Sequence, residues 1–298
     1  MEPKSQVANN VGMHFLIDLI KELRPKQWTK NLLVFASAIF AGNFLESVTF
    51  LNAIIAFFSF SFMASTIYVI NDIVDVEKDK VHPDKCNRPI ARGAITIPIA
   101  VCLAVCTFII SIILSYNLGI VPSIIVLVYF IINLMYSMYL KHVVIIDVMI
   151  IAFGFVLRAL MGALAVNGSL TSWFILCTLG LSLFLALGKR RHELQLFNVD
   201  SKNGRKVLES YSVEMLDQLM TMITAVIVMF YSMYAASQGK YMMFTIPLVL
   251  YGIFRYYYLI HKKSGGGKPE DTLLNDRHIL VTVILFGLSV LLIKGFLN

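Results

Sequence analysis

Residues 48–79 read VTFLNAIIAFFSFSFMASTIYVI followed directly by NDIVDVEKD. The first stretch, residues 48–70, carries no charged side chain and is long enough to cross a hydrocarbon core of about 30 Å as a helix. The second stretch, residues 71–79, places several carboxylates at the end of that helix. We therefore expect a membrane-spanning helix that ends in a segment able to carry chemistry.

The composition of the whole chain agrees with this expectation. Of its 298 residues, 58% are hydrophobic and only 14% are charged, whereas a soluble domain carries about 25% charged residues. The mean hydropathy is +0.77. These values exclude a disordered chain, a nucleic-acid-binding domain and an ordinary cytosolic enzyme, and they predict an integral membrane protein.

Apolar runs of similar length recur along the chain and predict about nine transmembrane helices. They must be helices, because only a helix satisfies its own backbone in lipid and no run alternates as a barrel strand does. The expected fold is one all-α membrane domain over residues 1–298. The predicted spans are 30–44, 48–70, 95–115, 119–140, 143–165, 171–188, 216–236, 240–260 and 278–296.

The basic residues predict the orientation of these spans. All but three of the 25 lysines and arginines lie on the side of the N-terminus; the exceptions are Arg158, Lys240 and Lys294. By the positive-inside rule this side is cytoplasmic. Residues 13–24 predict an amphipathic helix lying in the cytoplasmic interface and stopped by Pro25, and the alternative is an extension of the first span. Neither a cleavable signal peptide nor a disulfide or zinc framework is expected.

Carboxylates are not required by membrane topology. On a helix, Asn71, Asp72, Asp75 and Asp79 share one face, where like charges repel one another. A hard cation removes that penalty, and Mg²⁺ held by one or two carboxylates together with substrate phosphates is the common arrangement. The alternative is an acidic helix end that is simply solvated.

A loop rich in proline and cations follows this acidic face. Residues 82–93 include Pro83, Pro89 and Gly93, which favour a fixed loop over a helix. Lys85 and Arg88 in this loop are suited to phosphate oxygens. Acidic and basic groups this close together predict a site for a metal and a diphosphate.

The Asn-Asp-x-x-Asp-x-x-x-Asp stretch after the second span resembles the UbiA superfamily of intramembrane prenyltransferases. Five further stretches resemble one branch of that superfamily, the decaprenyl-phosphate phosphoribosyltransferases. These stretches extend over most of the chain, at residues 23–31, 82–91, 188–194, 208–211 and 269–277.

The resemblance implies a reaction and a setting. The expected enzyme transfers a 5-phosphoribosyl group from 5-phosphoribosyl 1-diphosphate to a polyprenyl (decaprenyl) phosphate, with Mg²⁺ as cofactor, inversion at the anomeric carbon and release of diphosphate. The resemblance further implies a homo-oligomer in the bacterial inner membrane, with its active site facing the cytoplasm. It also implies a role in supplying arabinan precursors for the cell envelope, and no nucleic-acid partner.

The second cytoplasmic site supports the branch on physical grounds. Ordinary members of the superfamily carry a second aspartate-rich motif there, whereas residues 188–194 read GKRRHEL, with one carboxylate. Lys189 and Arg190 suit additional phosphates better than a second metal ion, and the alternative is that they only anchor topology. Glu193 is expected to position a ribose hydroxyl or the metal. Neither Arg191 nor His192 is given a role.

The fifth predicted span carries two charged residues, Asp147 and Arg158. They are eleven residues apart, so they share a helix face at a separation of about 16 Å. Charged groups within spans usually face a cavity inside the bundle. Arg158 is expected to reach toward the phosphates or to pair with a structural carboxylate. Asp147 is expected to cap the site or to pair with Lys141.

Two segments, residues 71–93 and 188–212, are the expected active-site loops. The expected catalytic residues are Asp72, Asp75 and Glu193, and the expected metal ligands are Asn71, Asp72, Asp75 and Asp79. The expected substrate-binding residues are Lys26, Lys30, Asn31, His82, Lys85, Arg88, Arg158, Lys189, Arg190 and Tyr211.

Two other functions compete with this interpretation. A prenyltransferase that moves a polyprenyl group from its diphosphate to an aromatic acceptor predicts a second acidic motif, which residues 188–194 lack. A transporter predicts polar residues through the midplane and inverted repeats with broken helices, whereas most of the predicted spans are almost purely apolar.

Overall fold

The computed structural model describes residues 4–41, 47–83, 85–168, 170–197, 206–262 and 275–297. Within these ranges the chain forms helices and turns and no strand, which confirms the predicted all-α class. Short 3₁₀ or π-helical turns connect the longer helices. These turns are η1 (Pro25–Leu32), η2 (Lys85–Asn87), η3 (Leu140–His142), η5 (Lys206–Ser210), η6 (Met242–Thr245) and η7 (Ile293–Leu297).

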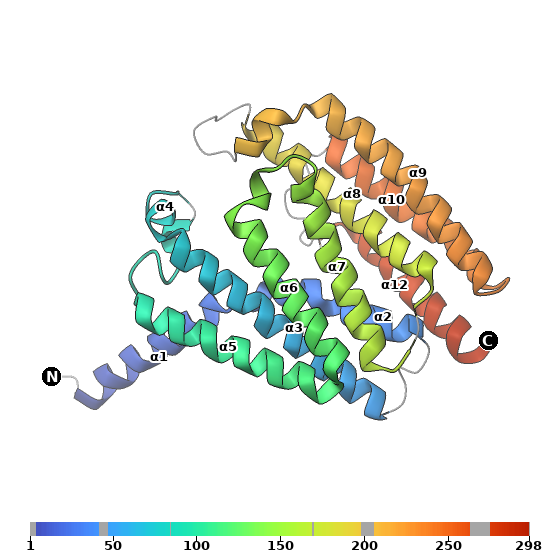
Figure 1. The fold of residues 1–298 in the computed structure, drawn as a ribbon. Helices are drawn as coiled ribbons and strands as arrows, with labels where there is room; N and C mark the ends of the chain where they lie inside the picture. Colours follow the sequence, from blue (N-terminus) through green and yellow to red (C-terminus); the bar gives the residue numbers. More distant parts are fainter. Residues whose placement is uncertain are drawn as a thin grey trace. The chain divides into compact units, whose positions relative to one another are not determined.

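Figure 1 shows the α-helices in chain order. They are α1 (Lys4–Glu22), α2 (Leu33–Ala41), α3 (Ser47–Val74), α4 (Val76–Lys80), α5 (Ile97–Leu118), α6 (Ile120–Met138), α7 (Ile146–Ala165), α8 (Ser172–Phe197), α9 (Val213–Ser237), α10 (Ile246–Lys262) and α12 (Arg277–Leu292).

Eight of the described helices are long and apolar enough to cross a membrane: α3, α5 to α10, and α12. The remaining predicted span, residues 30–44, begins within η1 and continues as the short helix α2. Its last residues lie outside the described ranges, so the ninth crossing stays a prediction. The predicted N-terminal helix is present and longer than expected, because α1 begins at Lys4.

The chain divides into two units, each with its own packing. Unit 1 comprises residues 1–32 and 51–137, and unit 2 comprises residues 33–50 and 138–298.

In unit 1, α3 packs directly against α5 and α6. The hydroxyl of Ser59 donates to the carbonyl of Ser111 at 2.9 Å, and the hydroxyl of Ser111 donates to the carbonyl of Ser59 at 2.7 Å. The rings of Phe60 and Tyr129 join α3 to α6 with centroids 5.1 Å apart. Small hydroxyl residues let helix backbones approach closely in lipid and hydrogen-bond across the interface.

The segment after α1 is anchored on α3. The indole nitrogen of Trp28 donates to Ser65 at 3.1 Å, and the Ser65 hydroxyl donates to the carbonyl of Leu23 at 2.7 Å. The side-chain amide of Asn31 donates to Ser61 at 3.0 Å. The end of α1 and all of η1 are therefore fixed next to the end of α3 that carries the acidic stretch.

In unit 2, α7 to α10 and α12 surround an apolar core that also includes residues of η5. Helix α2 packs closely on α7 at Gly162, where an added Cβ would collide with the carbonyl of Val34 and the hydroxyl of Ser37. The lack of a side chain at Gly162 therefore sets how closely α2 and α7 approach.

Candidate active site

The backbone hydrogen bonds of a helix continue through the acidic stretch of unit 1, where α3 is followed by α4. Asp75 is the residue between the two helices, yet its N–H still donates to the carbonyl of Asn71 and its carbonyl still accepts from the N–H of Asp79, each at 2.9 Å. Asp72 and Asp79 therefore come to lie close to the same partner.

That partner is Arg88. One nitrogen of Arg88, Nη1, donates to Asp72 at 2.8 Å and to Asp79 at 2.5 Å. Both carboxylates are buried, with 3% exposure each. Lys85 Nζ lies 3.9 Å from Asp79 at the more exposed edge. The structure thus brings together Asp72, Asp79, Lys85 and Arg88 out of the residues predicted from the sequence.

Asp75 does not join this group, although the sequence predicts all of these carboxylates on one helix face. Its carboxylate pairs with Lys78 at 3.4 Å in a partly exposed position. The backbone at Asp75 departs from helical geometry, with φ −95° and ψ 10°. Asn71 is half-buried, and its carbonyl is used by the helix.

Arg24 also belongs to this site and was not predicted as a site residue. Its guanidinium donates to Asp72 at 2.5 Å and lies over the ring of Tyr68, 5.1 Å from the centroid. Arg24 has a φ of 53°, an uncommon conformation for a residue other than glycine. The signal for it in the sequence was its place just before Pro25, in a stretch that resembles the family.

Glu22 lies at the end of α1 beside Asp72. Only 1% of its surface is exposed, and neither carboxylate oxygen has a hydrogen-bond partner among the residues that the structure describes. Burial and the neighbouring charge of Asp72 raise the pKa of Glu22 to about 8. We call the set of Glu22, Arg24, Asp72, Asp79 and Arg88 the Asp72 cluster.

Four other predicted residues of unit 1 lie in the flanking segments. Lys26 is exposed, and Lys30 donates to the side chain of Gln27 at 2.8 Å. Asn31 is buried against Ser61, which gives it an anchoring contact. His82 is half-buried at the start of the loop, where its carbonyl accepts from the N–H of Cys86.

A second polar cluster lies in unit 2 around Arg190. The Arg190 Nε donates to Asp147 at 2.6 Å, and its Nη1 donates to Glu193. The hydroxyl of Tyr211 donates to the other oxygen of Asp147 at 2.7 Å. Arg190 is 1% exposed and Asp147 is fully buried. We call Asp147, Arg190, Glu193 and Tyr211 the Arg190 cluster. The structure shows Asp147 in this network, where the sequence left open a cap on the site or a pair with Lys141.

The Arg190 cluster includes strained backbone. The Tyr211 hydroxyl accepts from the N–H of Ile145 at 2.7 Å, and Ile145 has a φ of 70°. For a β-branched residue this is a genuine outlier, of the kind that persists only where its surroundings enforce it. Burial and the hydrogen bond to Asp147 raise the pKa of Tyr211 well above its ordinary value. The network therefore fixes the start of α7.

The neighbouring cations take different places. Lys189 Nζ lies 4.0 Å from Glu193. Arg191 pairs instead with Asp217 of α9 at 2.6 Å, and Asp217 also contacts the ring of His261 at 3.2 Å. Arg191 thus joins helices of unit 2, a contact that no local sequence pattern indicates.

Arg158 lies within α7 and bonds to its own helix. Its Nη1 donates to the carbonyl of Gly154 at 2.8 Å, and its guanidinium lies 5.1 Å from the centroid of the Phe155 ring. The side chain therefore extends one turn back, toward the N-terminal end of α7.

The Asp72 cluster fits a divalent cation in one specific way. No group of three or more histidine, cysteine or acidic side chains converges on a metal position in the described part of the chain. Mg²⁺ does not require such a group, because one or two carboxylates together with substrate phosphates complete its coordination. Asp72 and Glu22, whose oxygens accept no hydrogen bond from the described residues, are two carboxyl groups that can meet this requirement.

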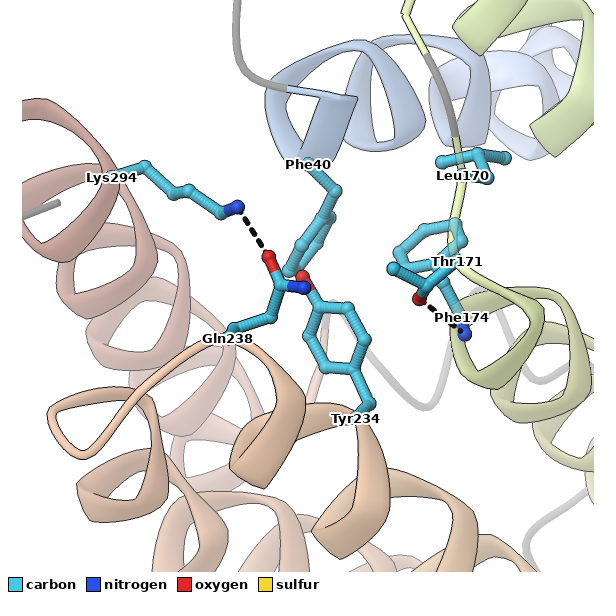
Figure 2. Close-up of a pocket in the computed structure, with 7 residues that line it drawn as sticks. All are labelled: Phe40, Leu170, Thr171, Phe174, Tyr234, Gln238 and Lys294. Atoms are coloured by element: carbon cyan, nitrogen blue, oxygen red, sulfur yellow. Dashed lines mark hydrogen bonds between the residues drawn. The ribbon is translucent and has the colours of Figure 1, made fainter.

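A small pocket of about 180 Å³ lies elsewhere in unit 2 and contains no predicted site residue. Figure 2 shows Lys294 donating to the side chain of Gln238, with Phe40 and Tyr234 beside them. The remaining lining residues are Leu170, Thr171 and Phe174.

Comparison with known proteins places this architecture in a family context. The profile of the UbiA prenyltransferase family matches residues 32–272. A protein of Mycolicibacterium smegmatis named decaprenyl-phosphate phosphoribosyltransferase is 35% identical over 96% of this chain and 94% of its own length. A protein of the same name from Corynebacterium glutamicum is 34% identical over 89% of this chain and 83% of its own.

Solved structures give the same fold. A UbiA homologue from Archaeoglobus fulgidus, bound to DMAPP and Mg²⁺, superposes with a TM-score of 0.74. The alignment covers 94% of this chain and 99% of that chain at 17% sequence identity. At this identity the likeness establishes the fold alone.

Proposed function

Because the chain belongs to the UbiA prenyltransferase family, we propose that this multi-pass membrane protein is a polyprenyl-phosphate phosphoribosyltransferase. It transfers a 5-phosphoribosyl group from 5-phosphoribosyl 1-diphosphate to a polyprenyl phosphate such as decaprenyl phosphate. The bond from the anomeric carbon to the diphosphate breaks, a bond from the lipid phosphate oxygen to that carbon forms, and diphosphate leaves with the bonding electrons.

One observation of the site supports this reaction above ordinary prenyl transfer. The second cytoplasmic segment presents Lys189 and the buried Arg190 with Glu193 as the nearby carboxylate, in place of a second aspartate-rich motif. Phosphoribosyl diphosphate and a lipid phosphate together bring three phosphate centres, which require counter-charge. The names of the relatives at 34% and 35% identity support the same choice.

In this proposal the Asp72 cluster binds the diphosphate. In the structure, Arg88 contacts Asp72 and Lys85 lies near Asp79. When the diphosphate binds, its oxygens take the place of these carboxylates as partners of Arg88 and Lys85. Arginine offers several donors in a planar fork that matches phosphate oxygens. Mg²⁺ neutralises the charge of the departing diphosphate when it is bound, and the residues proposed to hold it are Asn71, Asp72, Asp75 and Asp79.

The Arg190 cluster is proposed to bind a phosphate group. Asp147 and Tyr211 keep the guanidinium of Arg190 in one orientation, so its position is set before substrate binds. Glu193 accepts from Arg190 and is 23% exposed in its side chain, which leaves an acceptor for a ribose hydroxyl. A phosphate monoester is already anionic near neutral pH, so the attack needs no strong general base.

The location is part of the proposal. Positive charge on the N-terminal side supports a cytoplasmic site in a bacterial inner membrane. We propose in addition a homo-oligomer, and a product that serves as an arabinan precursor for the cell envelope, as the resemblance implies.

One assay tests the reaction. Membranes that contain the protein are incubated with ribose-labelled phosphoribosyl diphosphate, decaprenyl phosphate and Mg²⁺, and label is measured in the organic phase. Labelled lipid is expected. Consumption of a prenyl diphosphate by an aromatic acceptor, with no labelled lipid, contradicts the proposal and favours the prenyltransferase.

A site variant tests the acidic stretch. Asp75→Asn is expected to reduce transfer at least about 100-fold with normal expression, because Asp75 is proposed to hold the Mg²⁺ that stabilises the departing diphosphate by several kcal/mol. Glu77→Asn is the control, since Glu77 lies on the same segment and pairs with Lys80 at 2.6 Å on the surface. Near-normal turnover of the Asp75 variant contradicts a metal role for this residue.

A further inference from the structure

The end of α1 carries a carboxylate that the sequence pattern did not single out. Glu22 is the last residue of α1, 1% exposed, and its two oxygens have no hydrogen-bond partner in the described residues. A buried polar group without a hydrogen-bond partner costs free energy, and the cost is largest when a carboxyl group carries its charge. The C-terminal end of a helix adds a partial negative charge and makes the position still less favourable for an acid.

The described surroundings of Glu22 give its oxygens no hydrogen bond. The nearby buried carboxylates are Asp72 and Asp79, and the nearby guanidinium groups are Arg24 and Arg88. Both guanidinium groups direct their hydrogen bonds to the aspartates and neither bonds to Glu22. The two arginines and Lys85 are used by Asp72 and Asp79, and no described residue donates a hydrogen bond to Glu22.

We infer that Glu22 is a ligand of the divalent cation, shared with Asp72. This inference rests on the proposed metal-dependent function and adds a ligand from outside the acidic stretch. Two carboxylates are what Mg²⁺ takes from protein when substrate phosphates supply other oxygens. Glu22 and Asp72 come from α1 and α3, which the Trp28–Ser65 and Ser65–Leu23 hydrogen bonds hold together.

The backbone between α1 and η1 places a cation next to the proposed metal ligands. Arg24 follows Glu22 after one residue and adopts a φ of 53°, which turns its side chain onto Asp72. When a cation occupies the two carboxylates, Arg24 and Arg88 become available for the phosphates that arrive with it. A single segment thereby supplies both a metal ligand and a phosphate-binding guanidinium.

Metal affinity tests this inference independently of turnover. The purified full-length protein is titrated with Mn²⁺, and free Mn²⁺ is followed by its electron paramagnetic resonance signal. Glu22→Gln preserves the shape of the side chain and is expected to weaken Mn²⁺ binding at least about tenfold, as loss of groups at metal sites does. Glu22→Asp, which retains the carboxylate on a shorter chain, is expected to fall between Gln and wild type.

Glu77→Gln provides the matched control. It removes the same charge from the exposed surface of the same unit, 78% exposed in its side chain, and is expected to leave Mn²⁺ affinity within about twofold. Equal affinity of the Glu22→Gln variant and wild type contradicts the inference, and so does a wild-type protein that binds no Mn²⁺. If affinity falls as expected while no protein makes labelled lipid, the ligand assignment stands and the proposed reaction is wrong.

Discussion

At the scale of single residues, two tyrosines of α9 differ in whether their buried hydroxyl groups form a hydrogen bond. Tyr231 shares a hydrogen bond with Thr245 at 2.5 Å, whereas the buried hydroxyl of Tyr234, in the pocket of Figure 2, has no partner in the part of the chain described. A buried polar group without a partner costs free energy, and a hydrogen-bonded one contributes.

We therefore expect opposite effects from the same substitution. Tyr234→Phe should leave the protein as stable or stabilise it by up to about 1 kcal/mol, while Tyr231→Phe should destabilise it by about 1 kcal/mol. Thermal unfolding in detergent, followed by tryptophan fluorescence, measures both. Clear destabilisation by Tyr234→Phe would mean that its hydroxyl is bound by a group in the pocket.

Some contacts of single residues in the candidate site could be predicted from the sequence, and others could not. Helical spacing predicted that Asp72 and Asp79 share a face beside the cationic loop, but it did not predict their direct contact with Arg88, which was expected to bind phosphate. Arg24 meets Asp72 across 48 positions of sequence, so no local pattern reveals the pair. Asp75 departs from the expected face because the backbone changes there, which side-chain spacing alone does not register.

At the scale of elements, the approach of α2 to α7 depends on one glycine. Gly162→Ala is expected to destabilise unit 2 by about 1–3 kcal/mol, because the new methyl meets the backbone carbonyl of Val34, which has no room to move. The same substitution at Gly287 of α12 meets no atom within 4 Å and should be neutral or slightly stabilising. Thermal unfolding of the two variants, measured side by side, checks the pair; equal effects would contradict the close packing.

The contacts at the start of α12 make the stability of the folded protein depend on pH. Asp276 caps this helix through the N–H of Ile279 and pairs with Arg255, and the hydrogen bond from Arg255 leads the causes that lower the pKa of Asp276 to about 2 from an ordinary 3.8. Because the pKa is lower in the folded protein, the ionised carboxylate stabilises the fold at pH values above about 4. This contribution is lost as the pH falls from about 4 toward 2.

Asp276→Asn isolates that contribution, because asparagine remains a good N-cap and does not titrate. The variant should have a lower midpoint of thermal unfolding than wild type at pH 6, and the difference should shrink as the pH approaches 3. A difference that stays constant over this range would show that ionisation of Asp276 does not contribute.

At the scale of the whole molecule, hydropathy predicted the helices well because each span satisfies its backbone internally. The apolar side chains that remain exposed, such as Ile113 and Ile124 at 56% and 51%, lie on α5 and α6, as expected for surfaces that face lipid. Hydropathy did not predict which charged side chains meet across helices. Arg191 lies next to Arg190 in sequence, yet it pairs with α9, because the turn of the helix points the two side chains in different directions.

The predicted orientation is open to a direct measurement. Cys86 lies in the loop expected to face the cytoplasm, and Lys240 on the opposite side. In a variant that keeps Cys86 alone, a membrane-impermeant maleimide should label the protein only after the cells are lysed. In a cysteine-free variant carrying Lys240→Cys, labelling should occur in intact spheroplasts; the reverse pattern would contradict the orientation.

The buried pair of Asp147 and Arg190 has a consequence for how this sequence can change over generations. Each residue is at most 1% exposed, and each neutralises the other at 2.6 Å. Losing Arg190 leaves the charge of Asp147 buried, at a cost of about 3–5 kcal/mol, which is a large share of the stability of a protein. Losing Asp147 removes a buried carboxylate partner from Arg190, which keeps its contact with Glu193. Lineages that replace one of these residues should therefore replace the other as well, so the two positions are expected to covary among relatives even though 43 positions separate them along the chain.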